Sequence, residues 1–180
     1  MMPTKYELVT SVPIPAEAVV GHTYELVHLA DAYSVQLPSG TLTDPELLAR
    51  FLFSQQPRWI GGLMKMRDAL VAGLGLKTAR HLESIGEHDQ TNRLGIFKIY
   101  GKSSLEIVFG EDDKHLDFRL SVLCTSPAAT QDEQSLVFTS VVRCHNRLGR
   151  IYIFLIAPFH RLVVQASLRQ AARLGWPCQL

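Results

Sequence analysis

The chain has 180 residues, of which 47% are hydrophobic and 19% are charged, with a net charge of +1. This balance is typical of a globular protein with a hydrophobic core, and it excludes an intrinsically disordered chain. The length fits a single domain over residues 1–180, for which we expect a poorly ordered start at 1–15 and a short tail at 175–180.

The cysteines and the apolar stretches bear on the cellular compartment. Cys124, Cys144 and Cys178 are odd in number, and no two of them have C-x-x-C spacing. This indicates inert thiols in a reducing compartment and no metal site. The N-terminus lacks the apolar run of a signal peptide, and the longest apolar stretch, 151–159, is about half a bilayer span. We therefore expect a cytoplasmic protein without a transmembrane segment.

Charge is unevenly distributed along the chain. From Arg143 onward there are six arginines and no acidic residue, so the preceding residues have a net charge of −5. Such asymmetry is typical of a surface that meets a polyanion or a membrane, or simply of a helix with a solvated, arginine-rich face. Binding to nucleic acid is not expected, because no basic motif is interleaved with aromatic residues.

The first half of the chain predicts one strand and two helices. A strand is expected over 32–38. A helix follows Thr43, the expected N-cap, with Pro45 in its first turn and Glu46 completing a capping box. Pro57 ends this helix. A second helix is expected over 58–73, and its buried side chains are predicted to be Trp59, Ile60, Leu63 and Leu70.

The next segment changes from helical to alternating periodicity. Short strands are predicted over 96–100 and 105–109, and a charged hairpin turn over 110–114. Longer strands are predicted over 115–125 and 136–145. On the first long strand, His115, Asp117 and Arg119 share one face, and Arg143 and His145 share one face of the second.

The last element is a long helix over 148–174, kinked or broken near Pro158. Its broad apolar face is predicted to contain Leu148, Tyr152, Leu155, Ile156, Phe159, Val163 and Ala166. The opposite side contains Arg147, Arg150, Arg161 and Gln165. We therefore predict an α+β fold in which a curved antiparallel sheet wraps around the C-terminal helix, with two shorter helices after the first strand.

This order of elements resembles the helix-grip architecture of START-like and Bet v 1-like (SRPBCC) proteins. The resemblance implies a cavity for an apolar ligand between sheet and helix.

Several segments also resemble a bacterial family, Domain of Unknown Function 2867. They are A-D-A-Y-S-V-Q-L-P (30–38), P-R-W-I-G-G-L-M-K-M-R-D-A-L (57–70), F-G-E-D-D-K-H-L-D-F-R-L-S-V (109–122), V-V-R-C-H-N-R-L-G-R-I-Y (141–152) and P-F-H-R-L-V-V (158–164). The block G-E-D-D-K-H-L-D-F-R is the most specific of them. Some members of that family resemble a fusion with a dinucleotide-binding domain. This chain lacks such a domain, and we expect no cofactor.

The candidate site residues form one group and three single residues. His115, Asp117, Arg119, Arg143 and His145 could bind an anionic head group or perform acid–base chemistry, or they could be cross-strand pairs on a solvated convex face. His160 could line a cavity mouth, or satisfy a carbonyl freed by Pro158. Trp59 is expected in the core or a cavity wall. Tyr152 is on the face predicted to meet the sheet. No metal site is expected.

Three classes of function stay open at this point. The first is a module that binds a small apolar or amphipathic ligand between the sheet and the C-terminal helix. The second is an accessory domain whose apolar, arginine-rich helix contacts a second copy, another partner or a membrane surface. The third is a cyclase, isomerase or hydrolase that uses His115, Asp117 and Arg143.

Overall fold

The computed structural model of the chain describes residues 5–63, 65, 92–125 and 134–178. Its strands are β1 (Thr10–Val12), β2 (Leu29–Gln36), β3 (Arg93–Leu94), β4 (Phe97–Lys102), β5 (Glu106–Asp112), β6 (Leu116–Thr125) and β7 (Ser135–Cys144). They form one antiparallel sheet with the order β1-β2-β7-β6-β5-β4-β3. This sheet and the long C-terminal helix confirm the predicted α+β class and are consistent with the helix-grip architecture.

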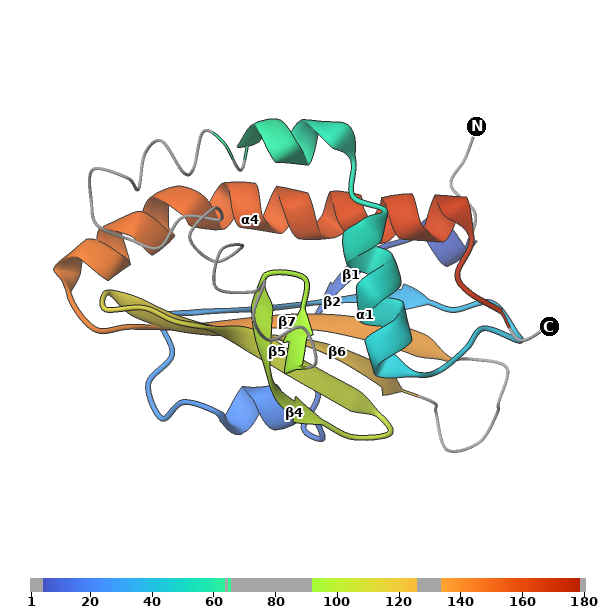
Figure 1. Cartoon of the computed structure of the whole chain (residues 1–180), viewed down its shortest axis with the longest axis horizontal. Helices are drawn as coiled ribbons and strands as arrows, with labels where there is room; N and C mark the ends of the chain where they lie inside the picture. Colours follow the sequence, from blue (N-terminus) through green and yellow to red (C-terminus); the bar gives the residue numbers. More distant parts are fainter. Residues whose placement is uncertain (1–4, 64, 66–91, 126–133, 179–180) are drawn as a thin grey trace.

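The helices are α1 (Pro45–Ser54) and α4 (Arg147–Leu174), with short 3₁₀ turns η1 (Lys5–Glu7) and η2 (Val19–His22). Residues 58–63 and 65 are also helical. The rest of the predicted second helix, including Leu70, lies outside the described residues. Figure 1 shows the sheet as a middle layer, with α4 along one face and η2 on the other.

The main core lies between the sheet and the two longer helices. Val164, Leu168 and Ala171 of α4 and Leu48 and Leu52 of α1 are buried against the sheet. The residues of the sheet that meet them alternate along each strand, because successive side chains point to opposite faces. They include Tyr33, Val35, Ile107, Phe109, Leu120, Val122, Leu136 and Phe138.

The other face of the sheet is covered by the segment that contains η2. Ala18 and Val20 pack against Val108 and Val141 of the sheet. The buried carboxylate of Glu106 accepts hydrogen bonds from the backbone N–H groups of η2, at 2.7 Å from Val19 N and 3.4 Å from Val20 N. The interpretation of this face as a solvated convex surface is therefore wrong for its central part.

Two predicted details of the first helices are wrong. Asp44, not Thr43, is the N-cap of α1, because its Oδ1 accepts hydrogen bonds from the N–H groups of Glu46 (2.8 Å) and Leu47 (3.0 Å). An Asp at this position satisfies the free donors of the first turn in the same way that Thr would. Trp59 is 44% exposed and so is not a core residue.

Helix α4 runs through Pro158 as one element, close to its predicted bounds, but its buried face differs from the prediction. Leu155 and Phe159, expected to face the sheet, are 59% and 45% exposed. The buried residues of α4 are Gly149, Val164, Ser167, Leu168 and Ala171. Periodicity could not identify the inner face, because apolar residues surround the first half of this helix.

Candidate functional site

Asp31 is a carboxylate within the hydrophobic interface between the sheet and α4. It lies on β2 with Leu29, Tyr33 and Val35, the alternate residues that face the helix. Its side chain is 8% exposed. In the sheet it pairs with Ser140 of β7, which is fully buried. A charged residue thus occupies a position where the alternation of buried residues along β2 predicts an apolar side chain.

Two side chains of α4 reach this pair. His160 Nε2 lies 2.8 Å from Ser140 Oγ and 3.7 Å from Asp31 Oδ1. Arg161 Nε lies 3.6 Å from Asp31 Oδ2. We refer to Asp31, Ser140, His160 and Arg161 as the Asp31 cluster. His160 therefore contacts the sheet, whereas one interpretation of the sequence assigned it to a carbonyl freed by Pro158.

Both oxygens of the Asp31 carboxylate are buried without a hydrogen-bond partner among the described residues. The His160 and Arg161 nitrogens are too distant from the Asp31 oxygens to donate a good hydrogen bond, although the positive charge of Arg161 favours the carboxylate. Burial of a carboxylate without donors costs free energy, so such groups are rare in native cores and often have a function. The unused acceptors of Asp31 suit a ligand group that donates hydrogen bonds.

The geometry of the cluster does not fit nucleophilic catalysis. In a Ser-His-Asp triad the serine and the carboxylate contact different ring nitrogens of the histidine. Here Ser140 and Asp31 both approach His160 Nε2. The arrangement therefore suits recognition by hydrogen bonds and charge.

The row of residues that crosses the sheet from Asp31 changes from polar to apolar. In register, Asp31 pairs with Ser140, which pairs with Leu120, followed by Phe109 and Ile99. Neighbouring residues of such a row lie about 5 Å apart. Along this single row the helix-facing side of the sheet is polar at β2 and β7 and apolar from β6 to β4.

A group of phenylalanines extends the apolar end of this row. Phe97 of β4 lies 5.6 Å from the ring of Phe118 and 5.8 Å from that of Phe53 on α1, measured between ring centroids. These three rings are only partly buried, unlike Phe109 beneath them. They provide an accessible apolar wall that begins on β6, the strand next to β7, and extends to β4, three strands from β7.

Five of the predicted site residues lie on the opposite side of the sheet. Asp117 Oδ1 lies 3.0 Å from His145 Nε2, and His115 Nδ1 lies 3.0 Å from the side-chain amide of Asn146. Arg143 pairs in register with Asp117 and is exposed. Because the sheet separates these residues from the Asp31 cluster, the two groups cannot act on one small ligand.

Arg119, the fifth of these residues, is buried at 7% exposure. Its guanidinium carbon lies 3.4 Å from the ring centroid of Tyr100, and its Nη2 lies 2.8 Å from Asp112 Oδ1. Burial raises the pKa of Tyr24 to about 12, and burial together with its hydrogen bond to Asp112 raises the pKa of Tyr100. Both phenols are neutral at physiological pH, so the Asp112 carboxylate balances the charge of Arg119.

The three remaining predicted residues have different surroundings. Only His160 joins the Asp31 cluster. Tyr152 of α4 packs against Leu29 and Val142, near the start of the helix. Trp59 is exposed. Among the described residues, no three His, Cys, Asp or Glu side chains form a group that could hold a metal ion.

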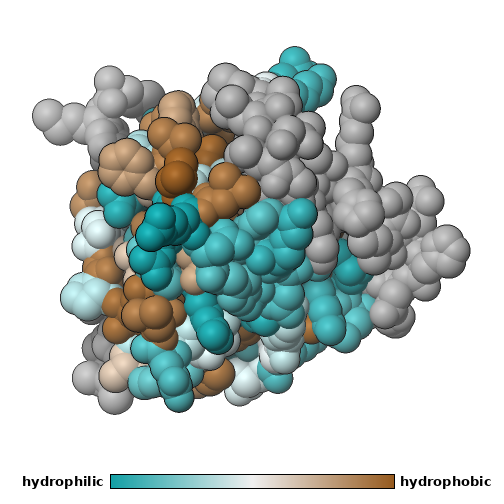
Figure 2. Space-filling model, turned by 90° about the vertical axis from the view of Figure 1, so that its left-hand side faces the viewer, coloured by the Kyte–Doolittle hydropathy of each residue, from teal (hydrophilic) through white to brown (hydrophobic). Residues whose placement is uncertain are grey.

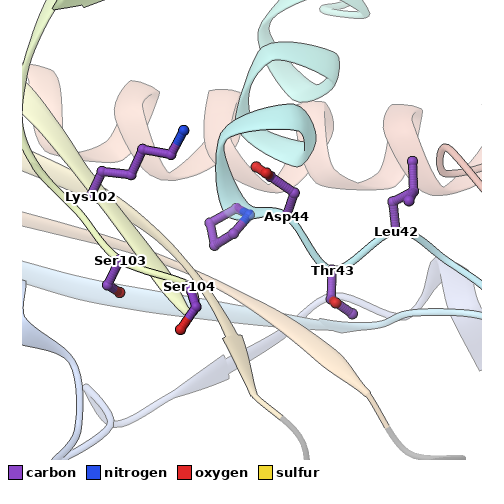
Figure 3. Close-up of a pocket in the computed structure, with 7 residues that line it drawn as sticks. Leu42, Thr43, Asp44, Lys102, Ser103 and Ser104 are labelled. Atoms are coloured by element: carbon purple, nitrogen blue, oxygen red, sulfur yellow. The ribbon is translucent and has the colours of Figure 1, made fainter.

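A shallow pocket of about 680 Å³ lies beside the first turn of α1, away from both groups. Figure 3 shows Lys102 and Ser103 on one side of it and Thr43 and Asp44 on the other. Lys102 forms an ion pair with Glu46. The hydrogen bonds that Lys102 and Arg50 donate to the Glu46 carboxyl lower its pKa. Asp44 is engaged as the helix cap, so the charged groups of this pocket already have partners.

Sequence reasoning missed Asp31 and Ser140. The predicted strand began at residue 32, so Asp31 fell outside its alternating pattern. With β2 starting at Leu29, the same pattern places Asp31 among buried residues, which is the signal that would have identified it.

The family model described as "Protein of unknown function (DUF2867)" matches residues 24–167. The chain belongs to this family. The match to DUF2867 includes all four residues of the Asp31 cluster and the five polar residues of the other face. No curated protein and no solved structure matches the chain.

Proposed function

We propose that this DUF2867 protein binds a small amphipathic ligand between the sheet and α4. The proposal depends on one observation, the buried Asp31 carboxylate whose two oxygens have no hydrogen-bond donor. A ligand hydroxyl, amide or ammonium group would donate to Asp31. The apolar part of the ligand would extend along Leu120 towards Phe118 and Phe97. The helix-grip arrangement of sheet and helix supports the same location.

The ligand's polar group would reach the cluster from the side of α4. His160 and Arg161 retain side-chain exposures of 25% and 52%, so this edge of the cluster is accessible. A donor group that reaches Asp31 would satisfy the orphaned acceptors, and a hydrogen bond to a charged group contributes about 1.5–3 kcal/mol. A ligand carboxylate would instead be repelled by Asp31.

The test compares decylamine, decanol and decanoate as probes, with binding measured by isothermal titration calorimetry. We expect decylamine and decanol to bind more tightly than decanoate. The variant Asp31→Asn should weaken decylamine binding by about tenfold to a hundredfold, which corresponds to one charge-assisted hydrogen bond. Asp117→Asn is the matched control, because it makes the same change on the other face of the sheet.

Equal affinity of the three probes, or equal effects of the two variants, would contradict the proposal. Thermal unfolding distinguishes a binding role from a structural one. Since Asp31 is desolvated without hydrogen bonds, Asp31→Asn should lower the free energy of unfolding by no more than about 1 kcal/mol. A large loss of stability would assign Asp31 to the structure of the core instead.

A further inference from the structure

The outer side of α4 exposes a continuous apolar stripe. Ile151, Leu155 and Leu162 are 58%, 59% and 52% exposed, and Phe154 is 79% exposed. At about 100° per residue, Ile151, Leu155 and Leu162 lie on one line along the helix, with Phe154 and Phe159 on either side of it. Figure 2, which views the molecule from the end where α4 begins, shows hydrophobic side chains gathered at the level of this helix. Exposed apolar surface of this extent marks an interaction site.

Arginines border this stripe on the side of Phe154, and α4 contains no acidic residue, although Asp31 of β2 contacts Arg161. Arg147, Arg150 and Arg161 are exposed and lie towards the side of Phe154 on the helix. From Arg143 to the C-terminus the chain contains no aspartate or glutamate. The surface therefore combines exposed aliphatic and aromatic groups with a rim of positive charge.

The helix is fixed on the sheet. By length and composition α4 could cross a bilayer, and 17% of its most apolar window is buried. However, Val164, Leu168 and Ala171 of its inner face belong to the main core, and His160 contacts β7. These contacts hold the helix axis along the sheet, so only its outer face is available to a partner.

We propose that the outer face of α4 binds the surface of an anionic lipid bilayer. The stripe of Ile151, Phe154, Leu155, Phe159 and Leu162 would enter the boundary between head groups and acyl chains. The arginine rim would contact lipid phosphates. An amphipathic helix that lies in the interface has this combination of an apolar face and basic flanks.

Charge favours a bilayer over a second copy of the chain as the occupant. In a symmetric dimer the same patch meets itself, so the two stripes would bring arginines of both copies close together. Like charges across an interface oppose association. An anionic membrane supplies the opposite charge and an apolar layer at once.

The test is vesicle sedimentation of the full chain with phosphatidylcholine vesicles, with and without 30% phosphatidylserine. We expect binding to the anionic vesicles that weakens with added salt, and little binding to the neutral ones. Arg147→Gln and Arg150→Gln should each weaken binding about fivefold. The double variant Phe154→Gln/Leu155→Gln should weaken it at least tenfold.

Leu105→Gln is the matched control, since Leu105 is 58% exposed on the hairpin between β4 and β5, away from α4. Its vesicle binding should equal that of the unaltered chain. Absence of binding to anionic vesicles at low salt, or equal losses in Leu105→Gln and in the double variant Phe154→Gln/Leu155→Gln, would overturn the proposal. A concentration-dependent dimer that the double variant Phe154→Gln/Leu155→Gln abolishes, without vesicle binding, would assign the stripe to a second copy.

Discussion

Arg119 shows how a single cation is accommodated inside this sheet. The guanidinium stacks on Tyr100, pairs with Asp112 and donates a hydrogen bond from Nη1 to the carbonyl of Phe118 at 2.9 Å. The planar group satisfies all three contacts at the same time. Lysine has a compact charge and cannot stack and pair in this way.

We therefore expect Arg119→Lys to lower the free energy of unfolding by about 2 kcal/mol, because a desolvated cation–π contact and a charge-assisted hydrogen bond are both lost. Urea denaturation measures the change. Arg143→Lys is the control, because Arg143 is exposed on the neighbouring strand and its replacement should change stability by less than about 0.5 kcal/mol. Similar effects of the two variants would show that the stacking contributes little.

At the same scale, alternation predicted the faces of these residues but not their burial. Arg119 and Arg143 share one face of the sheet, as expected, yet one is buried and the other is exposed. The difference arises because the segment that contains Tyr24 and η2 covers only part of this face. A contact between residues so far apart in the sequence has no signal in local periodicity.

Among the elements, α4 depends on how closely its first turn approaches the sheet. Asn146 caps the helix by accepting a hydrogen bond from Gly149 N at 3.0 Å. A Cβ atom on Gly149 would lie 2.2 Å from the backbone oxygen of His115. Only glycine permits this approach of the helix to β6.

Gly149→Ala should therefore destabilise the fold by about 2–4 kcal/mol, because a backbone atom cannot yield without moving α4 or β6. Thermal and urea unfolding measure the loss. Gly61→Ala is the control, since Gly61 is helical and a Cβ there meets nothing within 4 Å. That change should leave stability equal or raise it by up to about 1 kcal/mol. If Gly149→Ala left the free energy of unfolding unchanged, the start of the helix would be able to move away from His115 at little cost.

Element prediction succeeded for long regular segments and failed for short ones. β6, β7 and α4 were predicted nearly to their bounds, because each has a sustained period or a clear cap. β1 and β3 have three and two residues, too few to show any period, and they were missed. The Asp31 cluster was missed for a different reason, because the start of β2 was placed three residues late.

For the whole molecule, acid should weaken the attachment of the chain before β2 to the end of β7. The N–H of Cys144 donates to His28 Nδ1 at 3.0 Å. Burial, and then the charges of Arg150 and Arg143, lower the pKa of His28. His28 therefore binds a proton at a higher pH in the unfolded chain than in the folded chain, so stability falls as pH decreases through about 6.5.

We predict a lower unfolding free energy at pH 5.5 than at pH 7.5, and a smaller decrease in His28→Asn. Asparagine retains an acceptor near the position of Nδ1 but does not titrate. Urea denaturation at a series of pH values measures both slopes. The other histidines contribute equally to both proteins, so identical slopes would show that His28 does not contribute to the pH dependence.

The sheet order has a consequence for biosynthesis. Strand β2, near the N-terminus, finds its hydrogen-bonding neighbour in β7, about a hundred residues later along the chain. During translation, β2 and the covering segment before it cannot pair or pack with β7 until β7 has left the ribosome. Closing so long a loop is slow, and until then the unpaired edge of β2 can form hydrogen bonds with the wrong strand. Nascent chains halted before residue 135 should therefore depend on chaperones far more than those released after α4.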